Sequence, residues 1–390
     1  MDKNKRGKPQ FSGEKSGTTL KDSCVLIMGQ SPSSNSYNTS GDGLPFYQGN
    51  ADFGEENPIP RSWCTEPKKI AEKGDILISV RAPIGAINIA DEKCCIGRGV
   101  AAIRPNQEVM SPDFLQHQLF ASRNKLEAMG TGSTFKAIGK KTLSDFPVVI
   151  YPKNTQEAIA QQLNSIKKQI KTANSQLDQL DALVKSRFVE MFGDCHCEKK
   201  SIGDLVYEMH IGPFGSAMKS DAFVSEKEAA CVVYEQKHAI KQSIDLGWRY
   251  VDAAKKSELK RFAAGPGTML VSCRGTIGKV FQLPDNAPIG IIHPSVMKIE
   301  IDESKLNGVF FSFLLEKLFA EAETRAVGSG VKMAIKAKDL ASTEIEYPPI
   351  QLQQEFAAFV AQVDKLRFKT QQQIEKLEML KESLMQEYFG

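Results

Sequence analysis

Two segments of the chain carry residue types that catalyse reactions when they are correctly spaced. The segment GSTFKAIGKKT contains the glycines, lysine and threonine of a phosphate-binding loop, but Gly132 and Gly139 lie further apart than that loop requires. The segment EYPPI approaches the (Asp/Asn)-Pro-Pro-aromatic tetrapeptide of amino-methyltransferases, but Tyr347 precedes its prolines and Ile350 follows them. Neither segment therefore fits its chemistry.

A metal-dependent nuclease site can be assembled from Asp285, Glu303 and Lys305, which match the pattern PD…(D/E)xK. In such sites carboxylates hold the metal ion. Matches of this kind arise often by chance in a charged chain, and the first half of the chain has no counterpart. None of the five histidines lies in a nucleophile elbow. We therefore expect no catalytic residue in this chain and keep the nuclease as an alternative.

The segment CHC at residues 195–197 is the one cluster of potential zinc ligands. A zinc site normally takes four ligands in two spaced pairs, and His210, Cys231 and His238 supply no second pair. We interpret the cluster as a solvated turn between domains and expect no metal. The eight cysteines follow no disulfide-framework spacing, which predicts reduced thiols.

An internal repeat divides the chain into two halves. GDILISVRAPIGA (residues 74–86) recurs as GTMLVSCRGTIGK (residues 267–279), with Gly, Leu, Ser, Arg, Ile and Gly at the same places. GTGSTFKAIGKKTL (residues 130–143) recurs as VGSGVKMAIKAKDL (residues 327–340). A repeat of this length indicates a duplicated domain.

A long helix is predicted at the end of each half, before a closing Phe-Gly. From Ile159 to Val184 the apolar residues alternate between four- and three-residue spacings, which is typical of a coiled-coil seam. The second seam runs from Phe356 to Tyr388, where polar residues such as Arg367 interrupt it. Each helix has about 36 residues and is roughly 54 Å long at about 1.5 Å per residue.

The two helices are expected to pair with each other, because polar residues at seam positions fix one register. Antiparallel pairing is favoured because the chain after Gly193 must continue from the far end of the first helix. The alternative is that each helix lies on its own domain. The expected fold is α+β, with two similar mostly-β domains (residues 1–155 and 194–351) separated by two long helices (residues 156–193 and 352–390) that form an antiparallel coiled coil.

The two globular parts contain shorter predicted elements. Short runs rich in Val and Ile and bounded by Gly, Pro, Asn or Asp predict strands. Examples lie at residues 75–80, 100–105, 268–273 and 296–301. Apolar periodicity predicts helices at residues 112–129 and 307–327.

The charges of the chain nearly balance, with 50 Lys and Arg against 47 Asp and Glu. Any basic surface must therefore be local. No apolar run is long enough for a membrane helix, and the basic N-terminus lacks the apolar stretch of a signal peptide. We expect a soluble cytoplasmic protein without a membrane partner.

Two similar modules held apart by a rod suit the recognition of two separated DNA targets. Gly/Ser-rich loops can approach phosphates, Gln and Asn can contact adenine, and Arg and Lys can bind phosphate or guanine. The alternatives are that such loops are simple turns and that an arginine at a strand end pairs with an acid. The candidate DNA-binding residues are Ser31, Ser33, Ser34, Tyr37, Gln48, Asn50, Arg81, Arg98 and Lys136 in the first half, and Ser216, Lys219, Tyr234, Gln236, Arg274 and Lys332 in the second.

The chain resembles the specificity subunit of Type I restriction-modification systems along nearly its whole length. The resemblance rests on the duplicated G-x-x-L-(I/V)-S-x-R-x-x-I-G element, on GSTFKAI followed by a proline-containing step and QE, and on the closing LKESLMQEYFG. The second copy departs from this pattern, with GSGVKMAI in place of GSTFKAI.

This resemblance implies two target-recognition domains, each reading one half of a split, asymmetric DNA sequence, and a coiled coil that sets their spacing. It also implies a subunit without catalytic residues or a cofactor of its own. Such a subunit docks two modification subunits, which bring S-adenosylmethionine and methylate adenine, and restriction subunits that use ATP and Mg²⁺ to translocate and cut DNA. The remaining alternatives are the stand-alone nuclease and a coiled-coil scaffold that binds only protein.

Overall fold

The structure is a computed structural model that describes residues 15–132, 136–193, 197–327 and 336–390. The chain divides into two compact units, which we call unit 1 (Met1–Ser175 with Gln371–Gly390) and unit 2 (Gln176–Thr370). Both borders between the units fall inside long helices, so the predicted division into four domains at residues 155, 193 and 351 stays a prediction. No helix in these described ranges is long and apolar enough to cross a membrane.

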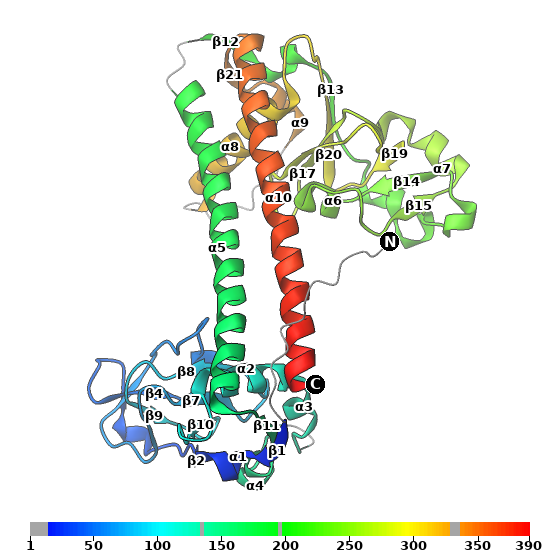
Figure 1. Ribbon diagram of the computed structural model, residues 1–390. Helices are drawn as coiled ribbons and strands as arrows, with labels where there is room; N and C mark the ends of the chain where they lie inside the picture. Colours follow the sequence, from blue (N-terminus) through cyan, green and yellow to red (C-terminus); the bar gives the residue numbers. More distant parts are fainter. Residues whose placement is uncertain (1–14, 133–135, 194–196, 328–335) are drawn as a thin grey trace, which may run out of the picture. The chain divides into compact units, whose positions relative to one another are not determined.

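Unit 1 is built around a four-stranded antiparallel sheet, with α2 and the first turns of α5 beside it (Figure 1). The strands in order are β2 (Cys24–Met28), β10 (Val100–Pro105), β7 (Ile76–Ser79) and β8 (Ile87–Ile89). A second sheet contains β3 (Tyr37–Asn38), β5 (Trp63–Cys64), β4 (Leu44–Tyr47), β9 (Cys94–Ile96) and β6 (Ile70–Ala71), and β1 (Ser16–Thr19) pairs with β11 (Pro147–Ile150). The short helices are α1 (Leu20–Ser23), α2 (Pro112–Ala121), α3 (Arg123–Ala128) and α4 (Lys140–Ser144).

Unit 2 repeats this topology. Its central sheet has the order β13 (Val206–Ile211), β20 (Val296–Ile301), β17 (Met269–Ser272) and β18 (Val280–Gln282). The second sheet contains β15 (Arg249–Val251), β14 (Cys231–Tyr234), β19 (Gly290–Ile292) and β16 (Ala263–Ala264), and β12 (Glu198–Ser201) pairs with β21 (Glu344–Tyr347). The helices are α6 (Gln236–Lys241), α7 (Ala253–Glu258), α8 (Gly308–Val327) and α9 (Ala337–Ala341). The predicted duplication is therefore confirmed for the central sheet, for the outlying strand pair and for four strands of the second sheet, while β3 of unit 1 has no counterpart among the described strands of unit 2.

Each central sheet is buried on both faces. Along β7, Ile76 and Ile78 point into the core on the helix side, whereas Leu77 joins the core shared with the second sheet. In unit 2, Met269 and Leu270 divide between two cores in the same way. Because neighbouring side chains of a strand point to opposite faces, a strand buried on both sides reads as a continuous apolar run. This is why the short apolar runs were sufficient to predict these strands.

The helices within the globular parts follow the prediction with one exception. Within the predicted range 307–327, Gly308–Val327 form a single helix, α8, as expected. Residues 112–129 were expected to form one helix, but the helix breaks at Ser122, between α2 and α3. The backbone of Ser122 has φ −91° and ψ 5°, outside the α-helical region, and its side chain is buried. The apolar periodicity continues across the break, so it could not reveal it.

Two helices of 40 residues, α5 (Lys153–Phe192) and α10 (Ile350–Phe389), form the predicted antiparallel coiled coil. In unit 1 the start of α5 packs with the end of α10, where the Tyr388 hydroxyl lies 3.1 Å from the Gln162 side-chain oxygen. In unit 2 the end of α5 packs with the start of α10. There the seam residue Arg367 binds Asp181 on the facing helix. The alternative of two helices that lie separately on their own domains is therefore wrong.

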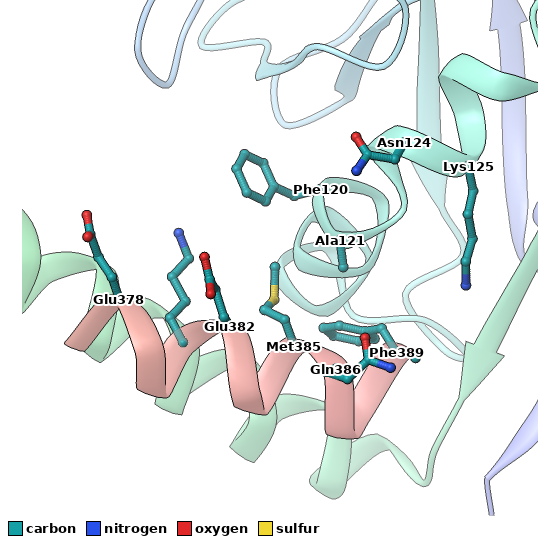
Figure 2. A pocket seen from close by; sticks show the side chains of 11 residues that line it. Phe120, Ala121, Asn124, Lys125, Glu378, Glu382, Met385, Gln386 and Phe389 are labelled. Atoms are coloured by element: carbon teal, nitrogen blue, oxygen red, sulfur yellow. The ribbon is translucent and has the colours of Figure 1, made fainter. Parts of the chain in front are cut away.

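The end of each long helix is anchored by aromatic residues in a globular core. At the end of α10, the ring of Phe389 lies 5.2 Å from that of Phe114 on α2. Figure 2 shows this end of α10 facing α2 and α3, where a groove of about 630 Å³ lies between them. The corresponding pair in unit 2 is Phe192 and Phe310, at 4.7 Å. The repeated Phe-Gly that closes each half thus marks the end of a helix that is held by an aromatic core.

The start of each long helix is held by a buried glutamine. In α5, the Gln156 side-chain oxygen accepts a hydrogen bond from the Ser111 amide, and its nitrogen donates to the Val109 and Tyr151 carbonyls, all at 2.8 Å. This side chain is fully buried, so no water can replace these bonds. It fixes the direction in which α5 leaves the sheet.

Gln353 does the same at the start of α10. Its side-chain oxygen accepts a hydrogen bond of 2.9 Å from the Asn307 amide, and its nitrogen donates to the Lys305 and Pro348 carbonyls at 3.2 and 2.9 Å. This side chain is also fully buried. The duplication therefore extends to the polar groups that orient the helices.

Substitution Gln156→Ala should destabilise the protein, because it leaves the Ser111 amide buried without a partner and removes the hydrogen bonds to two part-buried carbonyls. An unsatisfied buried group costs about 1–3 kcal/mol, so we expect the free energy of unfolding to fall by about 3 kcal/mol. Urea unfolding followed by circular dichroism measures this change. Gln161→Ala, at an exposed position of the same helix, is the control and should change stability by less than about 0.5 kcal/mol. Equal effects of the two substitutions would contradict the anchoring role.

Candidate nucleic-acid interface

In each unit, three strands bring loops to one edge of the central sheet. In unit 1 the register pairs Met28 with Ala101 and Ser79 with Val100, so β2 and β7 end where β10 begins. In unit 2 the register pairs Ile211 with Met297 and Ser272 with Val296. We call this edge, with the connections that leave it, the loop edge of each unit. Most of the candidate DNA-binding residues lie on these connections.

The repeated sequence element forms a tight turn on the loop edge. In unit 1 the buried Ser79 hydroxyl donates to the carbonyls of Arg81 and Pro83, at 2.8 and 2.6 Å. The amide of Gly85 donates to the Ser79 carbonyl at 2.9 Å, and its φ of 83° is one that glycine adopts readily. The turn therefore has a fixed shape, and the exposed Arg81 side chain projects from it.

The second copy forms the same turn. The Gly278 amide donates to the Ser272 carbonyl at 2.8 Å, and the Ser272 hydroxyl accepts from the Lys279 amide at 2.9 Å. Gly278 has φ 77°, and a Cβ atom at this position would collide with Phe319 on α8. The repeated serine and glycine thus serve the turn and its packing, and the repeated arginine, here Arg274, stays exposed.

Arg81 and Arg274 are available for a ligand. Within the part of the chain that the structure describes, neither guanidinium forms an ion pair with a carboxylate. The expectation that an arginine at a strand end pairs with an acid therefore does not hold for these two residues. By contrast, Arg104, the penultimate residue of β10, forms a two-pronged bond with the buried Asp75, at 2.7 and 2.8 Å. Unpaired guanidiniums on a rigid turn suit phosphate or guanine.

The loop Gly97-Arg98-Gly99 brings further candidates of unit 1 together. The Arg98 Nε atom donates to the Ser31 hydroxyl at 3.3 Å. A Cβ atom at Gly99 would collide with the Gln48 carbonyl oxygen, so the backbone of Gln48 lies directly against this loop. The Gly99 carbonyl in turn accepts from the Val80 amide at 2.9 Å, beside the Arg81 turn. Ser31, Gln48, Arg81 and Arg98 therefore share one surface.

Lys136 joins the same surface from a different segment. Its carbonyl accepts from the Ala82 amide at 3.2 Å, and Ala137 forms a β-bridge with Arg81. The Lys136 side chain is exposed. Its counterpart in the repeat, Lys332, lies outside the described residues.

The remaining candidates of unit 1 lie on two connections of the same unit. Ser33 and Ser34 are exposed, whereas Asn50 is half-buried at the start of a short 3-10 helix. Tyr37 is half-buried, its hydroxyl donates to the Pro32 carbonyl at 2.9 Å, and its ring lies 4.8 Å from that of Phe46. Tyr37 therefore braces the serine-rich loop through its hydroxyl and its ring.

Unit 2 corrects one of the candidates. Tyr234 is fully buried, and its hydroxyl donates to the Pro288 carbonyl at 2.5 Å. Its side chain is part of the hydrophobic core and is not accessible to DNA. The end of β14 is covered on both faces, so Val233 and Tyr234 are both buried, in different cores, which a short tyrosine-containing segment did not reveal.

The other described candidates of unit 2 remain at least partly exposed. Gln236 is half-buried, and its side-chain nitrogen donates to the carbonyl of Arg274 and to that of Thr276, the latter at 3.1 Å. This glutamine therefore supports the arginine turn. Ser216 and Lys219 are exposed on the connection that follows β13.

Charge on the loop edge of unit 2 comes from few residues. Lys237 and Arg249 both pair with Glu235, at 3.0 and 3.5 Å, so these three side chains together carry one net positive charge. Burial lowers the pKa of His293, so this side chain favours the neutral form. Lys279, at the end of the repeated turn, is exposed without an ion pair in the described residues, and the sequence prediction missed it. The repeat could have identified Lys279, because the aligned residue of the first copy is Ala86 and the charge is therefore a difference between the two copies.

The residues of the alternative nuclease and metal sites are placed as follows. Among the described residues, no group of three or more His, Cys, Asp or Glu side chains lies close enough to hold a metal ion. Lys305 pairs with Asp302 at 3.1 Å. Cys195 and His196 lie outside the described residues. Cys197 is disulfide-bonded, so the prediction of a reduced thiol is wrong at this position, whereas six other cysteines are free and buried.

Comparisons with known proteins agree with this architecture. The family model for the Type I restriction modification DNA specificity domain matches residues 16–182 and 247–379. The putative type I restriction enzyme MjaX specificity subunit of Methanocaldococcus jannaschii is 43% identical over 160 residues, which are 41% of this chain and 38% of that protein. The match thus spans less than half the length of this curated relative.

Two solved structures share the fold of the whole chain. The Type I restriction-modification S subunit from M. genitalium covers 98% of both chains with a TM-score of 0.58 at 15% identity. A chain from a structure of the assembly and conformational transition of the type I R-M system covers 97% of this chain and 98% of its own, with a TM-score of 0.67 at 16% identity. The family model covers most of the chain, and the chain belongs to the Type I restriction-modification DNA specificity family.

Proposed function

We propose that this chain is the specificity subunit of a Type I restriction-modification complex, and that each unit binds one half of a split, asymmetric DNA target. The observation that carries this proposal is the equivalent placement of Arg81 and Arg274, both exposed and unpaired among the described residues, on the two loop edges. The surroundings of the two arginines differ, with Arg98 and Ser31 in unit 1 and Gln236 in unit 2. Different surroundings favour different half-sites and hence a non-palindromic target.

Within this proposal the candidate residues have distinct tasks. Arg81, Arg98, Lys136, Lys219 and Arg274 bind phosphate or guanine. The exposed Gln48 contacts a base edge, and hydroxyls of the exposed serines contact the backbone. The half-buried Tyr37 and Gln236 hold the loops in place. Asn50 and Lys332 remain candidates for contacts with bases and phosphates.

The long helices would set the spacing of the half-sites and would dock two modification subunits. Those partners would bring S-adenosylmethionine and methylate adenine, and restriction subunits with ATP and Mg²⁺ would cut the DNA. The subunit would act in the cytoplasm, without binding a cofactor of its own and without catalysis. Membership of the specificity family supports this division of labour, as does the name of the relative, a type I restriction enzyme specificity subunit.

Selection from random duplexes tests the proposal directly. The purified chain is mixed with random DNA, with and without its modification subunits, and bound DNA is sequenced. We expect a motif of two short conserved blocks around an unspecified gap. A library without sequence preference in either mixture would favour the protein-only scaffold. Cleavage of plasmid by the chain alone with Mg²⁺ would favour the nuclease alternative.

Substitution Arg81→Ala should weaken binding of the target about tenfold or more, because it removes a positive charge from the DNA surface. If the arginine contacts phosphate, the loss is the same for all bound sequences and the salt dependence falls by about one charge. If it contacts a base, one position of one half-site becomes unspecific. Fluorescence anisotropy at several salt concentrations measures both effects.

Lys73→Ala is the matched control for Arg81→Ala. Lys73 is exposed and lies at the opposite end of β7, where the strand begins. Its removal changes the net charge by the same amount but leaves the loop edge intact. Equal losses for the two variants would indicate a general charge effect and would contradict a specific role for Arg81.

Deletion of one heptad from each long helix, at residues 170–176 and 372–378, should shorten the gap between the half-sites. Each helix becomes about 10 Å shorter, which corresponds to about three base pairs, while the apolar seam is kept. Selection from random duplexes measures the gap. A shorter gap or lost recognition is expected, and an unchanged gap would refute the role of the helices as a spacer.

A further inference from the structure

Phe214 is the most exposed large hydrophobic side chain among the described residues, with 91% of its surface accessible. A single exposed apolar residue is ordinary on a protein surface and needs no function. Three further features distinguish Phe214: a fixed backbone, a polar neighbourhood and a different residue at the equivalent position of unit 1.

The backbone around Phe214 is fixed on both sides. Before it, the Gly212 amide donates to the Val296 carbonyl at 2.8 Å. A Cβ atom at Gly212 would collide with the carbonyl oxygen of His293. Pro213 is buried. After it, the Ala217 amide donates to the Phe214 carbonyl at 2.9 Å, and Met218 is 5% exposed in the core. The loop therefore holds the ring in solvent instead of folding it inward.

The neighbourhood of Phe214 is that of a nucleic-acid surface. The residue follows β13 by three positions on the loop edge of unit 2, and the exposed residues that follow it in the next seven positions are polar or glycine: Gly215, Ser216, Lys219, Ser220 and Asp221. Protein interfaces place an exposed aromatic residue among other apolar residues. Surfaces that bind bases combine an aromatic ring with cations and hydroxyls. The composition favours DNA over protein as the ligand of this ring.

Unit 1 has no aromatic residue at the equivalent position. Gly29 corresponds to Gly212, because its amide donates to the Val100 carbonyl at 2.9 Å as the Gly212 amide donates to that of Val296. Two residues further on, unit 1 has Ser31, which binds Arg98, where unit 2 has Phe214. The equivalent position is therefore occupied by a serine that binds an arginine in unit 1 and by a solvent-exposed phenylalanine in unit 2.

We propose that Phe214 stacks on DNA by inserting its ring at one base step of the half-site that unit 2 binds. Insertion of an apolar side chain opens a base step and partly unstacks it, and the ring replaces the lost stacking. This inference rests on the proposed function. It adds a stacking contact that does not depend on hydrogen bonds to the edges of the bases. The distortion is confined to one half of the target, because unit 1 lacks the ring.

The fluorescent base 2-aminopurine, which brightens when it is unstacked, tests this inference. The assembled complex with its modification subunits is mixed with target duplexes that carry the probe at successive positions of the half-site of unit 2. The position of the methylated adenine is left out, since the partners act there. We expect only the probe positions on either side of one base step to brighten with the unaltered protein and with Phe214→Trp, because each of these bases loses a neighbouring base on one face. With Phe214→Ala the signal should disappear, and affinity should fall about tenfold.

Controls separate the possible causes. Ile59→Ala removes an exposed apolar side chain of unit 1, which is 61% accessible, and should change neither signal nor affinity. Thermal unfolding of Phe214→Ala should match that of the unaltered protein, because the ring buries almost no surface. Unchanged brightening and affinity in Phe214→Ala would overturn the inference, as would impaired assembly with the modification subunits while the signal persists. If the unaltered complex binds no specific DNA, the proposed function fails and the inference fails with it.

Discussion

The architecture depends on how each globular core holds two helix ends. A core encloses the start of one long helix, oriented by a buried glutamine, and the end of the other, closed by an aromatic residue. Gln156 and Phe389 do this in unit 1, and Gln353 and Phe192 do it in unit 2. Because α5 begins in unit 1 and ends in unit 2, and α10 does the reverse, antiparallel pairing is the arrangement that satisfies both cores. Loss of either anchor would uncouple a helix from a sheet.

This anchoring leaves one edge of each central sheet free for variation. The buried Ser79 and Ser272 and the turn glycines keep the same turn in both units, so the exposed arginines occupy equivalent places. The surrounding loops can then differ without disturbing the scaffold. Loops on a rigid sheet commonly carry binding residues for this reason. The proposed recognition of two different half-sites by two copies of one fold follows from this separation of scaffold and loops.

Much of the fold could be predicted from the sequence because its signals are local. Coiled-coil spacing from Ile159 to Val184 and short apolar runs identify the helices and strands, and the repeat identifies the duplication. The surface could be predicted only in part, since it depends on contacts between distant segments. Burial of Tyr234 and the bond between Arg98 and Ser31 follow from strand orientation and loop conformation, which residue types do not reveal. The break at Ser122 was missed because the apolar pattern continues across it.

The central claim is that two independent modules read two half-sites. The most direct measurement is methylome sequencing of cells that express the chain with its modification subunits, before and after the globular part of unit 2 is exchanged for that of a related protein. The account predicts one split, asymmetric adenine motif, of which the exchange alters only one half and leaves the gap unchanged. A contiguous or palindromic motif, or an exchange that alters both halves together, would contradict it.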